Sequence, residues 1–171
     1  MINVSMDSQL LSTLMSCARL ADYRFNKNLV PKGTKSNSLE AGSLVHVILE
    51  HYAKAVINGK NRADALDIGF SYGKLYRQFG DTYLSETPNR ESGLNLQDDG
   101  QKYEVGYNDV IKTMAEYFDF WKADNFVIIS AEEVKGEVIY EDSELRVLWK
   151  AKFDRIIDGT HGFISMDHKT A

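Results

Sequence analysis

The feature that most constrains the fold is a change of pattern after Asn125. Before it, apolar residues recur every three or four positions, which is the period of an amphipathic helix. After it, short runs of β-branched, aromatic and aliphatic residues are separated by turn sequences such as Asp158-Gly159, a pattern typical of strands joined by hairpins. The sequence therefore predicts an α+β fold, with a helical part over about residues 1–124 and a sheet part over about 125–171.

Three segments of the helical part have a clear helical period. They run from about Met6 to Phe25, from Ser38 to about Val56, and from about Tyr103 to Lys122. The polar chain around residues 61–84 predicts one or two shorter helices. We expect the N-terminal helices to pack on a mainly antiparallel meander, with the aromatic stripe of the 103–122 helix facing the core.

Length and composition limit the number of domains and the classes of function that the chain can have. A chain of 171 residues is long enough to bury one core, so we expect a single domain over 1–171. A net charge of −5 argues against a wholly basic nucleic-acid coat and confines any phosphate contact to one groove. The single cysteine excludes an internal disulfide and is compatible with a reducing cytoplasm. With no apolar run long enough to span a bilayer, we expect a cytoplasmic protein without membrane contact.

Polar chemistry is concentrated on the last predicted strands. Asp167 and Lys169 are two residues apart, so they project from the same face of a strand. A tight hairpin brings Asp154 of the preceding strand beside them, and two carboxylates from adjacent strands can share one divalent cation. The lysine can orient a water molecule or neutralise charge on a phosphoryl oxygen. The alternatives are a solvated Asp-x-Lys ion pair and a solvent-exposed aspartate at a hairpin end.

Two further positions are candidates for the same site. His46 lies at the edge of the apolar face of the 38–56 helix, where the small residues Gly42 and Ala53 leave room for a ligand. A histidine in such a place is more often a packed side chain. Glu132 and Glu133 follow the first predicted strand, and either could supply another carboxylate, because strand alternation does not decide which one points inward.

The ordered set of motifs resembles a known family. The helix carries Gly42-Ser43-Leu44-Val45-His46, one strand carries Ala151-Lys152-Phe153-Asp154, and the last carries Met166-Asp167-His168-Lys169-Thr170. This order resembles the RecB-like branch of the PD-(D/E)XK nuclease superfamily, with its Gly-x-x-x-His helix, Gly-x-x-Asp strand and Asp-x-Lys-Thr strand. The resemblance implies an α/β/α restriction-endonuclease-like core and a metal-dependent DNA nuclease, most often an exonuclease, in recombination, repair or phage DNA processing.

The resemblance also implies roles for individual residues. His46, Asp154 and Asp167, with the main-chain carbonyl of His168, would bind Mg²⁺ or Mn²⁺. Lys169 would be the catalytic lysine. Glu132, or less readily Glu133, would match the upstream acidic position of the family. The implied reaction is phosphodiester hydrolysis, in which the cation and the lysine stabilise the added negative charge.

Three departures from the family pattern affect these expectations. Ala151 replaces the usual glycine, which a strand tolerates. Cys17 matches the first cysteine of relatives that hold an iron–sulfur cluster, but the chain lacks the other three, so we predict no such cluster. The sequence ends just after Thr170, where the family continues into a helix with a Gln-x-x-x-Tyr motif. We therefore expect a C-terminally truncated nuclease domain and leave open whether these residues are active alone.

Two other functions compete with the nuclease. The first is a catalytically inactive nuclease-like fold that binds DNA or another protein, and the second is an unrelated α+β domain. For the nuclease, the expected partners are single- or double-stranded DNA and recombination or phage replication proteins. Four basic side chains would flank the strand path: Arg19, Arg24, Lys150 and Lys152. Because the net charge is negative, we expect part of the DNA affinity to come from a partner or from a segment absent here.

Overall fold

The computed structural model describes residues 1–27, 29, 36–100, 104–124, 126–159 and 161–168. These residues form two compact units: Met1–Thr34 with Glu133–Phe153, and Lys35–Glu132 with Asp154–Ala171. The long strands β2 (Val127–Glu141) and β3 (Leu145–Gly159) contribute residues to both units. One domain over 1–171 stays a prediction.

The first unit combines strand pairing with a short helical segment. Strand β1 (Ile2–Met6) runs parallel to the first part of β3. Helix α1 (Ser8–Ser16) follows at once, because the Asp7 side chain accepts a hydrogen bond of 2.7 Å from the Leu10 amide and caps the helix. Helix α2 (Ala18–Ala21) and a π-helical turn (Asp22–Asn26) complete the segment.

The prediction of one helix from Met6 to Phe25 was wrong at Cys17, where the backbone is extended. The hydroxyl groups of Thr13 and Ser16 donate to the main-chain carbonyls four residues earlier, at 2.7 and 2.8 Å. Such bonds compete with the helical pattern and bend helices. The chain therefore ends α1 at Ser16 and starts α2 after Cys17.

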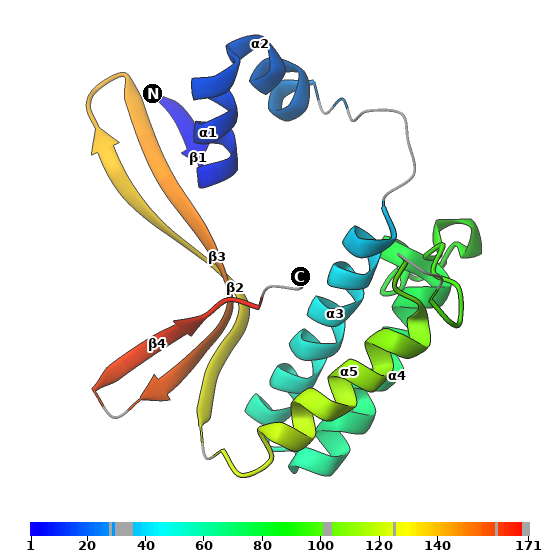
Figure 1. The fold of residues 1–171 in the computed structure, drawn as a ribbon. Coiled ribbons are helices and arrows are strands. Elements are labelled where there is room, and N and C mark those ends of the chain that lie inside the picture. The colour runs from blue at the N-terminus through cyan, green and yellow to red at the C-terminus, as the bar shows by residue number, and fades with distance from the viewer. Residues whose placement is uncertain (28, 30–35, 101–103, 125, 160, 169–171) are drawn as a thin grey trace. The chain divides into compact units, whose positions relative to one another are not determined.

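Three helices lie side by side in the second unit: α3 (Asn37–Ile57), α4 (Arg62–Phe79) and α5 (Tyr107–Phe120) (Figure 1). They enclose a core in which Leu44 and Ile48 of α3 are fully buried. The approach of α3 and α4 depends on Gly69, because a Cβ atom there would lie 2.8 Å from the carbonyl oxygen of Ile48. Only glycine allows this contact without a shift of the backbone.

The connection between α4 and α5 contains two 3₁₀ turns, Gly80–Thr82 and Arg90–Ser92. It is held against α3, since the buried carboxylate of Glu40 accepts a hydrogen bond of 2.8 Å from the Asn95 amide. Leu96 is buried in the same core as Leu44. The connection is thereby part of the second unit's core.

The four strands have the order β1-β3-β2, and β4 (Gly162–Met166) also pairs with β3. In the second unit, β4 runs antiparallel to the end of β3, with Arg155 opposite Met166 and Gly159 opposite Gly162. The predicted α+β class with a mainly antiparallel sheet is confirmed. The parallel strand β1 was not predicted, because five residues carry too little pattern and their partner lies far along the sequence.

Candidate metal centre

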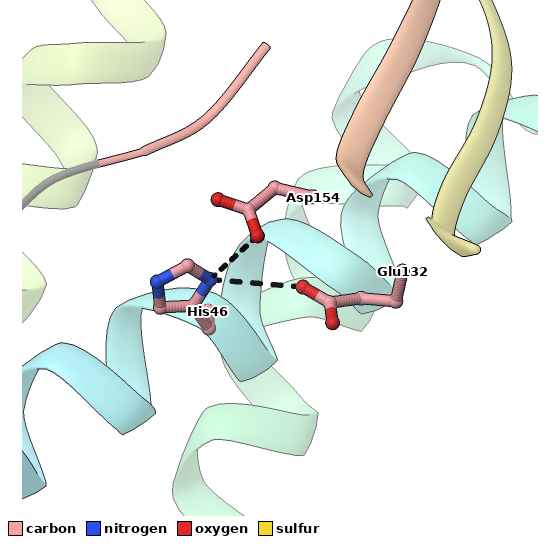
Figure 2. A group of neighbouring side chains, drawn as sticks. All are labelled: His46, Glu132 and Asp154. Atoms are coloured by element: carbon pink, nitrogen blue, oxygen red, sulfur yellow. Dashed lines mark ion pairs between the residues drawn. The ribbon is translucent and has the colours of Figure 1, made fainter. Parts of the chain in front are cut away.

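Three side chains from three elements of the second unit converge on one point. His46 comes from α3, Glu132 from β2 and Asp154 from β3 (Figure 2). Nδ1 of His46 lies 3.6 Å from Oε1 of Glu132 and 3.7 Å from Oδ1 of Asp154. All three candidate ligand atoms lie within 4.8 Å of one another. Ligands held about 2.1 Å from one Mg²⁺ are roughly 3 to 4 Å apart, so this group could close on a single cation.

Glu132 reaches the group through an unusual backbone conformation. Its φ is 54°, in the left-handed region that side chains other than glycine rarely adopt. This conformation interrupts strand alternation at Glu132. The sequence could not decide whether Glu132 or Glu133 points inward at this place. The structure brings the Glu132 carboxylate to His46, whereas Glu133 forms an ion pair with Lys135. Strain of this kind persists where the surroundings enforce it and is often found at functional sites.

Asp154 is oriented by the chain that follows β4. Its Oδ2 atom accepts a hydrogen bond of 2.7 Å from the main-chain amide of His168, while Oδ1 is the atom nearest His46. The His168 ring is held in turn, because its Nε2 atom and the Tyr117 hydroxyl share a hydrogen bond of 3.2 Å. Burial lowers the pKa of the His168 imidazole, and the positive charge of Arg155 lowers this pKa further. The neutral ring is therefore favoured.

The donor chemistry of the group fits a divalent cation. An imidazole and two carboxylates suit magnesium or manganese better than a soft metal. Glu132 and Asp154 have side chains only 8% and 15% exposed, and two carboxylates so close together repel each other unless a positive charge lies between them. The structure thus brings together ligand atoms of the kind that hold such a cation.

The other predicted site residues lie elsewhere or outside the described part. Asp167 is exposed, and it is not one of the three converging residues. Lys169 lies outside the described residues. The roles predicted for both residues, and for the main-chain carbonyl of His168, stay predictions.

The four predicted DNA contacts all belong to the first unit. Nε of Arg19 donates to the Tyr23 hydroxyl at 3.1 Å, and the Arg24 guanidinium lies 5.5 Å from the Phe25 ring centre. Lys150 and Lys152 are exposed on β3. Their contact with nucleic acid stays a prediction.

Sequence reasoning missed two neighbours of the group. Tyr117 lies on a helix whose aromatic residues were all expected to be core, and nothing in the sequence marked its hydroxyl as a partner of His168. Arg155 follows Asp154 directly and is 8% exposed. A charged residue directly before the β-branched pair Ile156-Ile157, in a predicted strand, was a signal that could have been noticed.

Comparison with known proteins decides the family. A family model described as the PD-(D/E)XK nuclease superfamily matches residues 8–171. The chain belongs to the PD-(D/E)XK nuclease superfamily. Nucleases of this superfamily use divalent metal ions and act on nucleic acid, and the α+β architecture is consistent with their restriction-endonuclease-like fold. No curated protein and no solved structure matches the chain.

Among the helices that the structure describes, none has the length and apolar character needed to cross a bilayer.

Proposed function

We propose that this superfamily member is a metal-dependent deoxyribonuclease of the RecB-like branch. The observation that carries the proposal is the convergence of His46, Glu132 and Asp154, three residues distant in the sequence, within a nuclease fold. Two carboxylates and an imidazole around one point are the ligand types that magnesium and manganese take in proteins.

Each residue has a distinct part in the proposed reaction. His46, Glu132 and Asp154 would hold Mg²⁺ or Mn²⁺, with Asp167 as a further ligand. The cation supplies positive charge that stabilises the negative charge gained by the phosphodiester during hydrolysis. The His168 amide fixes the Asp154 carboxylate with Oδ1 toward His46. Lys169 would neutralise further charge on the phosphoryl oxygens.

The finer assignment is an exonuclease of DNA recombination, repair or phage DNA processing, acting in the cytoplasm of a bacterial or phage-infected cell. Recombination or phage replication proteins would recruit it. The exposed lysines Lys150 and Lys152, with Arg19 and Arg24, would contact the phosphates of the bound strand.

Cleavage assays test the proposal. The 171-residue chain is incubated with linear single-stranded DNA, linear double-stranded DNA, closed circular DNA and RNA, in Mg²⁺, Mn²⁺ or chelator. We expect metal-dependent cleavage of linear DNA. Glu132→Gln and Asp154→Asn should each lower the rate at least 100-fold, because each removes a charged ligand. Cleavage of closed circles would indicate an endonuclease instead.

Glu133→Gln is the matched control. It removes the adjacent carboxylate, which pairs with Lys135, so we expect it to retain wild-type activity. If Glu133→Gln were as damaging as Glu132→Gln, the proposed ligand set would be wrong. DNA binding without cleavage, unchanged by all three substitutions, would favour the inactive binding fold.

A further inference from the structure

A small pocket lies in the second unit. Elements α3, α4, α5, β2, β3 and β4 all contribute to its lining. Five of its twelve lining residues are aromatic: Tyr52, Tyr117, Phe118, Trp121 and Phe126. Its volume of about 110 Å³ is of the order that admits one small group rather than a chain segment.

Arg155 gives this pocket its chemical character. The side chain is 8% exposed, and its guanidinium lies 5.9 Å from the Tyr52 ring centre. Its Nε and Nη2 atoms are buried and have no hydrogen-bond partner among the residues that the structure describes. These two nitrogens form one edge of the guanidinium, and their parallel N–H bonds match two oxygens of a phosphate or carboxylate.

The other cations of the lining are already engaged. Arg62 donates to the main-chain carbonyls of Trp121, Lys122 and Asp124, where α5 ends. The Lys122 ammonium pairs with Asp119 at 2.9 Å. Among the described cationic residues that line the pocket, Arg155 is therefore the one whose Nε–Nη2 edge is available to a ligand.

A buried acceptor lies in the same lining. Oδ2 of Asp124 is buried and has no hydrogen-bond partner among the described residues. Burying a polar atom without a partner is unfavourable, so both Asp124 and Arg155 point to a bound group that carries an oxyanion and also a hydroxyl or amino donor.

The pocket adjoins the candidate metal centre through the chain itself. Arg155 follows Asp154 in β3. Tyr117 lines the pocket and shares its hydroxyl hydrogen bond with His168, whose amide holds Asp154. These contacts link the lining of the pocket to Asp154, one of the three proposed ligands.

We propose that this pocket binds the phosphate group of one nucleotide unit of the nucleic acid, held on Nε and Nη2 of Arg155. The sugar and base lie against the partly exposed rings of Trp121 and Phe126, and a donor of the unit reaches Asp124. Phosphate recognition by a guanidinium edge and stacking on aromatic side chains are both general features of nucleic-acid binding. This inference rests on the proposed nuclease function and adds a second binding position to it.

Mononucleotide binding without metal tests the inference. The chain carries two tryptophans, so a Trp149→Phe background makes the fluorescence report Trp121. In EDTA, 5′-dAMP, 3′-dAMP, inorganic phosphate and deoxyadenosine are titrated separately. We expect saturable quenching by at least one nucleotide, with weaker binding of phosphate or nucleoside alone. Arg155→Gln should weaken nucleotide binding about 10- to 100-fold, as expected for loss of a charge-assisted pair, and Arg155→Lys should not restore it.

Stability measurements distinguish loss of a ligand contact from loss of the folded structure. Arg155→Gln removes a buried charge whose Nε and Nη2 atoms lack a partner, and also its side-chain hydrogen bond with Tyr117, so its urea midpoint should stay close to that of the parent. If Arg155→Gln and Asp124→Asn both lower the midpoint and the double variant shows strong coupling, the two residues are each other's partners and the inference is overturned. Phe126→Ala, at a partly exposed ring, provides a second variant that should weaken nucleotide binding and leave phosphate binding unchanged.

The two proposals can fail separately. His46→Ala should abolish cleavage and leave nucleotide binding in EDTA unchanged. Nucleotide binding without any cleavage by the parent would remove the nuclease proposal and keep the pocket. Metal-dependent cleavage with no saturable quenching, or with quenching that Arg155→Gln leaves unchanged, would remove the pocket proposal alone.

Discussion

Substituting Glu132 by glutamine should have opposite effects on stability without and with metal. In the metal-free protein, candidate ligand oxygens of Glu132 and Asp154 lie within 4.8 Å of each other. At an effective dielectric constant of about 20, two unit charges at that distance repel by about 3 kcal/mol. Because both side chains are largely buried, solvent screens this repulsion little. We expect Glu132→Gln to raise the free energy of unfolding in EDTA by about 1 to 3 kcal/mol.

Manganese should reverse the order of stability. A ligand that binds only the folded protein at 100 times its Kd adds about 2.7 kcal/mol. The wild-type protein should gain this amount, while Glu132→Gln should gain much less because one charged ligand is lost. The glutamine variant is thus expected to be the more stable protein in EDTA and the less stable one at saturating Mn²⁺.

Urea unfolding followed by circular dichroism measures both quantities at pH 8.5, where an ordinary histidine is neutral. Glu133→Gln is the control, since its carboxylate pairs with Lys135; it should show the full gain from Mn²⁺. A Glu132→Gln variant that is less stable than wild type in EDTA and gains as much from Mn²⁺ would refute the reasoning about this group.

Three further predictions concern the second unit. Gly69→Ala should destabilise the protein by about 1 to 3 kcal/mol in urea unfolding, because its Cβ would meet the Ile48 carbonyl, and a stabilised variant would contradict the tight crossing. Burial lowers the pKa of His51, so unfolded chains bind more protons as pH falls below about 6.5 and stability should drop there; His51→Gln should flatten that part of the curve. Burial, reinforced by Asp81, raises the pKa of Tyr76 to about 12, so stability should fall as pH rises above about 10, and absorbance should show delayed tyrosinate formation compared with unfolded protein.

The helices of the second unit were predictable because their signal is local. Helix α3 starts one residue before the predicted Ser38, and its end at Ile57 precedes the predicted Asn58-Gly59 stop. The period of buried residues lies within the segment itself, and the capping residue Ser36 stands directly before it. The break at Cys17 was not predictable in the same way, because it depends on which hydroxyls bond to the main chain.

The residues of the candidate site also differ in how far the sequence predicts them. His46 and Asp154 stand in short motifs that the sequence displays, and the structure brings them together. The choice of Glu132 over Glu133 depends on one left-handed backbone angle, which no pattern of apolar residues encodes. Tyr117 joins the neighbourhood only through packing between distant segments, so its part follows from the fold alone.

The left-handed angle at Glu132 has a consequence for engineering. Glycine or asparagine would adopt this conformation at lower cost, so a selection for heat resistance alone should enrich both at this position. Such variants would melt later and lose the carboxylate that faces His46. Libraries built on this chain therefore need a parallel screen for metal binding. Without that screen, the most thermostable variants will be ones that have lost the metal ligand.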